Sequence, residues 1–341
     1  MLRIKKSNLN ALYSRIAESQ DLFLPVKSAG KTNFALWQEG MEADLATLKT
    51  VRSAKDVFFP QSENLYSCCR TDGKLSVTPE TLCQKPFVVF GIKGCDVRGI
   101  AVLDKVFLSE PVDSFYAARR ANGTIVSLAC TRPETSCFCK VFGIDCAKPE
   151  GDIVTWLVGE DLYWQAQTEK GEKLTELVSD LLEEGEEAVV ESEQASIRSI
   201  VEKLPYSSLS LEKWGKDAAK NNFDSPLWEQ LYKPCLACGT CTFVCPTCQC
   251  YDIKDYDTGN GVQRYRCWDS CMYSDFTMMA HGNNRTSQMQ RFRQRFLHKL
   301  AYFPANNNGM FSCVGCGRCV DKCPSHLNIV KVIKAFGKEG V

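Results

Sequence analysis

The sequence predicts a multidomain α+β protein, with an N-terminal α/β domain at residues 1–168, a helical connector at 169–230 and a C-terminal, mostly helical domain at 231–341. Three observations support this division. Short apolar runs alternate with helical patterns in the first half of the chain. The middle is acidic and amphipathic, and the last third carries two similar cysteine-rich blocks. A chain of 341 residues has the length for about two domains.

Apolar runs predict the strands of the N-terminal domain. Residues 85–92 (KPFVVFGI) end in a glycine turn, and a helical pattern follows at 97–108, for which Asp96 is the expected N-cap. Residues 124–130 (TIVSLAC) predict another buried strand. The stretches GDIVTWLVG and DLYWQAQT, within 151–168, predict two neighbouring strands that form a hairpin or a sheet edge.

The connector begins with an acidic stretch at residues 169–193. Its apolar residues fall at i, i+3, i+4, i+7 and i+8, which predicts one helix packed on the first domain. These residues are Leu174, Leu177, Val178, Leu181 and Leu182. Further helical patterns at 191–204 and 210–232 lead to the cysteine-rich region.

Composition narrows the class of protein. The chain holds 20 cysteines but no apolar stretch of signal-peptide length at its start, so metal binding or redox chemistry is favoured over a secreted disulfide scaffold. No apolar run reaches bilayer-spanning length, so we expect a cytoplasmic protein with no membrane partner. Lys+Arg and Asp+Glu both number 41, and this balance gives no indication of a nucleic-acid partner.

The strongest motif is Cys-x2-Cys-x2-Cys-x3-Cys-Pro, which occurs in CLACGTCTFVCP and again in CVGCGRCVDKCP. This is the bacterial ferredoxin run for [4Fe–4S] clusters, in which the fourth cysteine binds the other cluster. The first set of ligands is therefore Cys235, Cys238, Cys241 and Cys323. The second set is Cys313, Cys316, Cys319 and Cys245. The C-terminal domain is thus expected to be a two-cluster ferredoxin-like domain with a long insert between its blocks.

Zinc is the alternative occupant of these cysteines. Zinc sites are typically built from paired Cys-x2-Cys knuckles or mixed Cys/His sets. Two copies of a three-cysteine run with a Cys-Pro favour clusters over a zinc-stabilised interaction module.

Four further cysteines in the N-terminal domain are candidates for a third cluster. Cys95 follows one predicted strand at the start of a helix, and Cys130 ends another. In a parallel sheet both would lie at the carboxyl edge, where α/β folds bind ligands, and Cys137 and Cys139 follow on the next loop. We expect these four, the N-terminal set, to hold a [4Fe–4S] cluster, and the alternative is four buried free thiols.

The remaining cysteines lack such a pattern. We expect structural roles for Cys68, Cys69, Cys83 and Cys146. Four cysteines in the insert could form another metal site, but we favour thiols that lie beside the clusters and tune their potentials. They are Cys248, Cys250, Cys267 and Cys271.

The insert ends in a basic segment at residues 285–299. Its cations either form a solvated face or offset the negative charge of the clusters. They include Arg291, Arg293, Arg295, His298 and Lys299. The glycine-rich turn GIKGCDVRG matches neither G-x-G-x-x-G nor the P-loop, so no dinucleotide site is expected on this chain.

The chain resembles the iron–sulfur beta subunits of cytosolic NAD(P)-linked [NiFe] hydrogenases (sulfhydrogenases) and the corresponding iron–sulfur subunit of anaerobic sulfite reductase. The resemblance covers most of the chain. It is carried by FVVFGIKGCDVRGIAVLDKVFL, LAC with CFC, CLACGTCTFVCPTCQCY, RCWDSC, RQRFLHK and CVGCGRCVDKCP. The N-terminal set, Cys248, Cys250 and Cys271 match family positions, whereas Cys267, Cys68, Cys69 and Cys146 depart from them.

The resemblance implies an electron-transfer subunit that works beside a flavoprotein subunit, which binds FAD and NAD(P)H, and a separate catalytic metalloenzyme subunit. No catalytic arrangement is evident in the sequence itself. The alternatives are a flavin-dependent reductase with its active site in the α/β domain, and the zinc-stabilised interaction module.

Overall fold

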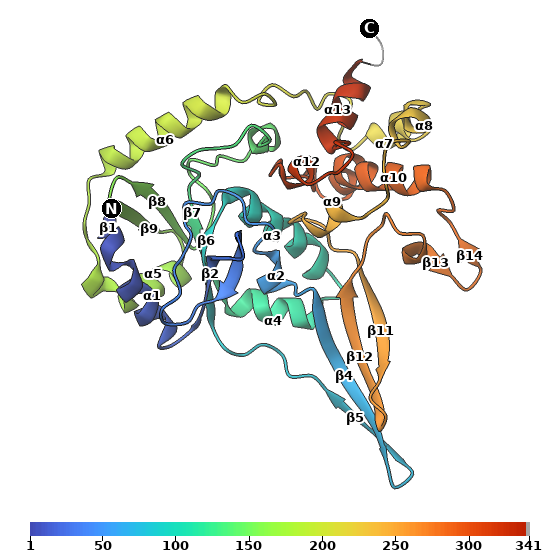
Figure 1. The fold of residues 1–341 in the computed structure, drawn as a ribbon, viewed down its shortest axis with the longest axis horizontal. Coiled ribbons are helices and arrows are strands. Elements are labelled where there is room, and N and C mark those ends of the chain that lie inside the picture. The colour runs from blue at the N-terminus through green and yellow to red at the C-terminus, as the bar shows by residue number, and fades with distance from the viewer. Residues whose placement is uncertain (339–341) are drawn as a thin grey trace.

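The computed structural model describes residues 1–338, and its N-terminal half is built on an eight-stranded mixed sheet (Figure 1). The four central strands are parallel: β2 (Asp21–Ser28), β6 (Phe87–Ile92), β7 (Gly123–Leu128) and β8 (Ile153–Val158). Antiparallel strands complete the edges: β3 (Lys31–Leu36) beside β2, and β9 (Asp161–Ala166), β1 (Leu2–Lys5) and β10 (Glu183–Glu184) beyond β8. Every residue of β6 and β7 is buried, as is typical of parallel strands covered on both faces.

Helices cover both faces of this sheet. They are α1 (Leu9–Ala17), α3 (Gly94–Phe107), α4 (Ser114–Asn122), α5 (Glu169–Leu177) and α6 (Glu187–Glu202). Helices α1 and α5 lie in the same core as Val88 and Phe90, whereas α3 and α4 pack with Val89 and Ile125, which point to the opposite face. Because successive strand residues face opposite sides, these two cores make a three-layer domain.

The strands predicted at 85–92, at 124–130 and within 151–168 are confirmed as β6, β7 and the β8–β9 hairpin. The N-cap prediction for Asp96 is wrong. Helix α3 begins at Gly94 with Lys93 at its N-cap. Asp96 lies in the first turn, where its carboxylate accepts hydrogen bonds from Arg318 and does not cap the helix.

The amphipathic helix predicted from Leu174 to Leu182 is confirmed only in part. Helix α5 ends at Leu177, β10 pairs with β1, and α6 starts only at Glu187. The chain breaks the helix because the backbone of Glu183 and Glu184 completes the sheet edge. The expected apolar residues still pack together on the first core despite the interruption.

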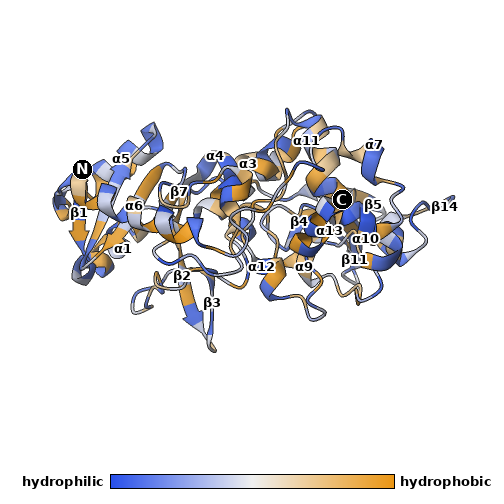
Figure 2. Cartoon of the chain, turned by 90° about the horizontal axis from the view of Figure 1, so that it is seen from above, coloured by the Kyte–Doolittle hydropathy of each residue, from blue (hydrophilic) through white to orange (hydrophobic). Residues whose placement is uncertain are grey.

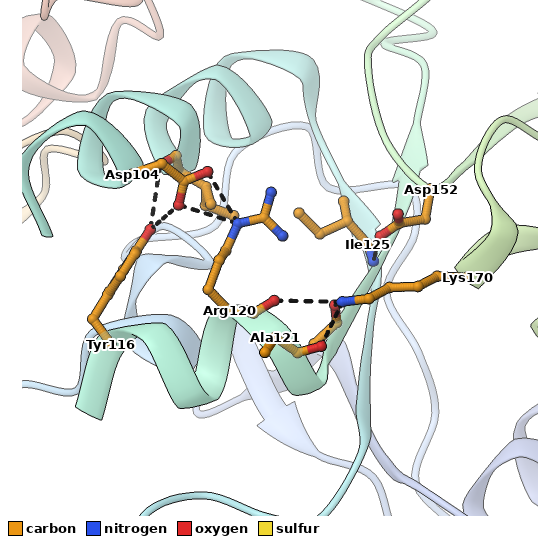
Figure 3. Close-up of polar contacts among 9 residues, drawn as sticks. Asp104, Tyr116, Arg120, Ala121, Ile125, Asp152 and Lys170 are labelled. Atoms are coloured by element: carbon orange, nitrogen blue, oxygen red, sulfur yellow. Dashed lines mark hydrogen bonds and ion pairs between the residues drawn. The ribbon is translucent and has the colours of Figure 1, made fainter. Parts of the chain in front are cut away.

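A polar network fixes the helices around β7 (Figure 3). Lys170, in the first turn of α5, donates to the carbonyl oxygens of Ala121 at 2.6 Å and Gly123 at 3.0 Å, where α4 ends. Asp104 of α3 accepts from the Tyr116 hydroxyl at 2.7 Å and from Arg120 Nε at 3.1 Å. Burial lowers the pKa of Lys170, yet its ammonium satisfies carbonyl groups that the end of α4 leaves free.

A second, four-stranded antiparallel sheet projects from the body of the molecule (Figure 1). Its order is β11 (Tyr251–Asp257), β12 (Gly261–Trp268), β4 (Ser62–Thr71) and β5 (Lys74–Pro79). The C-terminal domain was expected to be mostly helical, so the long strands β11 and β12 of its insert are a correction. This sheet spans the predicted boundaries at 168 and 230, because β12 of the C-terminal region pairs with β4 of the N-terminal region.

Buried charges anchor the base of the projecting sheet. Arg266 of β12 is 3% exposed, and its guanidinium donates to Glu63 of β4 at 2.7 Å. The same guanidinium pairs with Asp113, which precedes α4, and lies over the rings of Phe59 and Tyr251. A charged group this deeply buried is stable only when its partners surround it.

The C-terminal region is otherwise formed by short helices around its own apolar core. They are α7 (Ala218–Asn222), α8 (Leu227–Leu231), α9 (Thr240–Phe243), α10 (Gln288–Leu297), α11 (Phe303–Asn306), α12 (Arg318–Asp321) and α13 (Ile329–Lys338). Helix α2 (Lys55–Phe58) and the small β13 (Met278–Met279) and β14 (Gly282–Asn283) pair complete the described α-helices and strands. Trp228 lies at the centre of this core, against Phe292, Phe296 and Phe336.

Seen from above, the N-terminal sheet and the C-terminal helices lie at opposite ends of an elongated molecule (Figure 2). The connector contains α5, the short strand β10, α6, α7 and most of α8. None of the helices described over residues 1–338 is both long and apolar enough to cross a membrane.

We predict that Arg266→Met lowers the free energy of unfolding by about 3–5 kcal/mol, because it leaves the buried Glu63 carboxylate without its guanidinium partner. Denaturant titration followed by circular dichroism measures the change. Arg264→Met, on the same strand, is the matched control. Arg264 pairs with Asp255 at the surface, so its loss should leave the transition midpoint nearly unchanged. Equal effects of the two changes would contradict the anchoring role.

Candidate iron–sulfur centres

The two cysteine blocks adopt the same backbone conformation. Each loop is followed by a one-turn helix, α9 in the first block and α12 in the second. Ala237 (φ 53°) and Gly239 (φ 73°) correspond to Gly315 (φ 59°) and Gly317 (φ 79°), and all four lie in the left-handed region. The repeat seen in the sequence is therefore a repeat of structure as well.

The cysteines of the first set line one small, largely apolar cavity. Its lining includes all four expected ligands together with residues of the insert. These four are Cys235, Cys238, Cys241 and Cys323. Cys238 is exposed, and the neighbouring Thr240 hydroxyl lowers the pKa of its thiol. The first set therefore lies at the surface of the molecule.

The cysteines of the second set are brought together from both blocks. Cys245 of the first block lies close enough to Cys313, Cys316 and Cys319 for its charge to act on each of them. Burial raises the pKa of Cys313 to about 12, so this thiol would need a metal or a cation to become a thiolate.

The N-terminal set lies where the sequence predicted. Cys95 follows β6 in the first turn of α3, and Cys130 follows the end of β7, so both lie at the carboxyl edge of the parallel strands. Cys95 lies within electrostatic range of Cys130, and Cys137 within range of Cys130 and Cys139. The four thiols converge on one side of the sheet.

A fifth thiol at this place was missed by the sequence analysis. Cys146, expected to be structural, has its thiol within hydrogen-bond distance of Cys130 and Cys139. Its carbonyl oxygen also accepts from the backbone N–H of Cys130 at 3.0 Å. No spacing pattern links residues 130, 139 and 146, because the contact depends on how the loop folds back.

Buried cations lie beside the ferredoxin-like sets. Arg295 lines the cavity of the first set, and its Nε is buried without a hydrogen-bond partner. Lys299 donates to the Thr247 hydroxyl at 2.7 Å and the Ser312 carbonyl at 3.3 Å, close to Cys245. Burial by itself would lower the pKa of both groups, but the neighbouring thiolates outweigh it and raise both values.

The basic segment therefore divides between the two roles considered for it. Arg295 and Lys299 face the cysteines, whereas Arg293 stacks on Phe223 at the surface. His298 is not a cation at neutral pH, because burial and Lys299 lower its pKa to about 4.

The N-terminal set has its own buried cation. Lys93, 8% exposed, precedes α3, and burial lowers its pKa while the thiolates of Cys130 and Cys95 oppose that change. An ammonium in this position fits a group of net negative charge. The cations and the donor set thus both fit [4Fe–4S] clusters, which carry a charge of about −2 when oxidised with four thiolates.

The zinc alternative needs a tighter grouping. Across residues 1–338, no three or more His, Cys, Asp or Glu side chains gather closely enough to hold a single metal ion. Ligands of a cubane bind different iron atoms and stand further apart than the four ligands of one zinc ion. The choice of clusters over zinc therefore rests on the two ferredoxin motifs and not on this grouping.

Three of the four other insert cysteines lie beside the ferredoxin-like sets. The Cys248 thiol contacts that of Cys245, and the Cys250 thiol contacts that of Cys271. Cys267 is on β12, paired with Asp252 of β11, and is separate from these thiols. Cys68 and Cys69 lie on β4 in the projecting sheet, and Cys83 lies in the segment before β6. These positions agree with roles beside the clusters for Cys248, Cys250 and Cys271 only.

Comparisons with known proteins agree with this chemistry. Residues 234–327 match the family model of a 4Fe-4S dicluster domain. The chain is 31% identical over 335 residues to the Sulfhydrogenase 2 subunit beta of Pyrococcus furiosus, and the alignment covers 94% of this chain and 93% of that protein. No solved structure matches the chain.

We predict that substitutions at Gly315 and at Ala237, the equivalent positions of the two cysteine loops, differ in their effect on stability. A Cβ atom at Gly315 would lie 2.4 Å from the Phe138 carbonyl oxygen, so Gly315→Ala should lower the free energy of unfolding by about 1–3 kcal/mol. Ala237→Gly only relieves a positive φ, so it should change the free energy of unfolding by less than about 1 kcal/mol. Anaerobic denaturant titration compares the two variants, and equal losses would contradict the close contact with Phe138.

Proposed function

The chain belongs to the family of sulfhydrogenase beta subunits, and we propose that it carries electrons between a flavoprotein subunit, which binds FAD and NAD(P)H, and a catalytic metalloenzyme subunit. It is an iron–sulfur protein with [4Fe–4S] clusters, and its role is electron transfer within a multi-subunit oxidoreductase. The number of clusters, their ligands and the partners are the content of the proposal.

We assign one cluster to each of the three cysteine sets, the first, the second and the N-terminal. The observation that carries this assignment is their arrangement as neighbours. By the ferredoxin motif, the first and second sets exchange their fourth cysteines, and Cys316 of the second set lies within electrostatic range of Cys95 of the N-terminal set. Three neighbouring centres would form a path for electrons.

The chemistry of the electron donor indicates that the flavin belongs to a partner subunit. When bound, [4Fe–4S] clusters supply one-electron transfer, whereas a nicotinamide delivers two electrons as a hydride. A flavin must therefore stand between them. The sequence has no dinucleotide fingerprint, which supports placing the flavin on another subunit.

The ligand sets also argue against a substrate site. Four cysteines per set complete the coordination of a cubane and leave no open position for a substrate. The exposed Cys238 and the 68% exposed Leu236 place the first set where a partner can approach it. Conduction between subunits is the role that fits closed and partly exposed ligand sets.

We predict that the anaerobically purified chain contains about twelve iron and twelve acid-labile sulfide atoms, which correspond to three cubanes. Cys139→Ser should remove about four of each, because it takes one ligand from the N-terminal set. Metal and sulfide analysis with visible absorption measures both. Cys68→Ser, in the projecting sheet, is the matched control and should retain all of them.

Other outcomes would revise the assignment. Stoichiometric zinc without sulfide would restore the interaction-module alternative. Loss of iron from Cys146→Ser but not from Cys139→Ser would show that Cys146 is the ligand in place of Cys139. A chain with about eight iron atoms that Cys139→Ser does not change would contradict the N-terminal cluster alone.

We also predict that the isolated chain neither oxidises NAD(P)H nor binds a flavin, yet restores NAD(P)H-linked turnover when it is mixed with its partner subunits. Cys238→Ala, which removes one ligand of the first set, should fail to restore turnover. Steady-state assays with and without the chain test this. NAD(P)H oxidation by the chain alone, with a bound flavin, would instead support the flavin-dependent reductase.

A further inference from the structure

A buried ion pair joins the second set to the N-terminal set. Asp96 follows Cys95 directly, and Arg318 lies between Cys316 and Cys319. Both residues thus come from within the ligand-bearing segments themselves. Their side chains are 1% and 3% exposed, so the pair lies in the interior between the two sets.

The guanidinium of Arg318 is fully engaged. Its Nη1 and Nη2 donate to the two carboxylate oxygens of Asp96 at 2.5 and 2.8 Å. Its Nε donates to the carbonyl oxygen of Thr50 at 2.9 Å, and Nη2 also reaches the Thr50 hydroxyl at 3.1 Å. This forked arrangement fixes the relative position of α3 and the second cysteine loop, which a single point charge would not do.

The backbones around the pair are also in direct contact. The N–H of Phe138, between Cys137 and Cys139, donates to the carbonyl oxygen of Gly315 at 2.9 Å. Lys49 bridges the same two segments, because its ammonium reaches Glu134 at 2.7 Å and Asp321 at 2.6 Å. The N-terminal loop and the second cysteine loop are therefore held at a fixed separation.

The charges of the pair act on both cysteine sets. Burial raises the pKa of the Cys95 thiol, and the neighbouring charges of Asp96 and Cys316 add to this rise. The Arg318 charge opposes it. Burial also raises the pKa of the Cys316 thiol, and the same Arg318 charge opposes that rise. A buried ion pair gains little stability over an apolar pair, so its placement between two negatively charged centres calls for a further role.

The first set lies outside this junction. Its cavity is lined only by residues of the C-terminal region, within 235–241, 272, 292–296 and 323–327.

We infer that the Asp96–Arg318 pair is the junction through which the N-terminal centre exchanges electrons with the second centre, and that its two charges set the potentials of these centres in opposite directions. This rests on the proposed cluster in the N-terminal set. Arg318 and Asp96 are positioning residues, since they touch the ligand segments and not the iron. Cys95 and Cys316 would hold the two centres on either side of the pair, and the first set lies beyond the second.

The test is a potentiometric titration of the loaded full-length chain, followed by electron paramagnetic resonance. Signals of the N-terminal centre are those that disappear in Cys139→Ser. Arg318→Gln should lower the potentials of the N-terminal and second centres, because a nearby cation stabilises the reduced, more negative form. Asp96→Asn should raise both potentials. In each variant the potential of the first centre and the iron content should stay as in the wild type.

A change that only disturbed packing would not lower both potentials in one variant and raise both in the other. The double variant Asp96→Asn/Arg318→Gln removes both charges together, so its potentials should return towards the wild-type values even where one single variant folds poorly. Arg15→Gln is the matched control, because Arg15 lies on α1 and pairs with Asp180 at the surface. It should shift no potential.

Two results overturn the inference in distinguishable ways. Shifts of the same sign in both single variants, or a shift confined to one centre, would show that the pair does not join the two centres. A wild-type chain without the signals assigned to the N-terminal centre would refute the three-cluster proposal itself, and the inference would fall with it.

Discussion

The gathering of thiolates in a low-dielectric interior is the constraint on which the structure depends. Buried thiolates repel one another and lose their hydration, and either effect would keep a cysteine protonated. Buried cations lie beside each set and stabilise the thiolates. Arg295 lies at the first set, Lys299 at the second and Lys93 at the N-terminal set, and Arg318 lies between the last two. A formal net charge of +0 conceals this internal segregation of charge, in which cations that are normally exposed lie beside negatively charged centres.

The long insert between the two cysteine blocks has two physical consequences. Its strands β11 and β12 pair with β4 and tie the C-terminal region to the α/β domain through the buried Arg266 and Glu63. Its helix α10 and the following π-helical turn bring Arg295 and Lys299 beside the cysteines. The insert thus supplies both the anchor and the counter-charge that a compact two-cluster domain would have to find elsewhere.

Features that depend on local sequence could be predicted, and those that depend on distant partners could not. The buried strands β6 and β7, the repeat of the cysteine loops and the edge position of Cys95 and Cys130 follow from short-range patterns. The role of Asp96 could not be foreseen, because its partner Arg318 is 222 residues away and N-capping is the usual use of Asp before an apolar helical run. The β4–β12 pairing could not be predicted either, because its two strands lie far apart in the sequence. The neighbouring strand β11 is almost wholly exposed and gives little apolar signal. The position of Cys146 in the N-terminal set could not be predicted, because it depends on how the loop folds back towards Cys130.

Two loops of identical conformation have become different because of what faces them. The first loop surrounds a cavity near the surface and tolerates Ala237 at a positive φ, whereas the second loop presses against the Phe138 carbonyl and leaves room only for Gly315. The same asymmetry appears in charge, since Thr240 of the first loop corresponds to Arg318 of the second. The first half of the repeat therefore faces outward, whereas the second half faces inward, towards the N-terminal set.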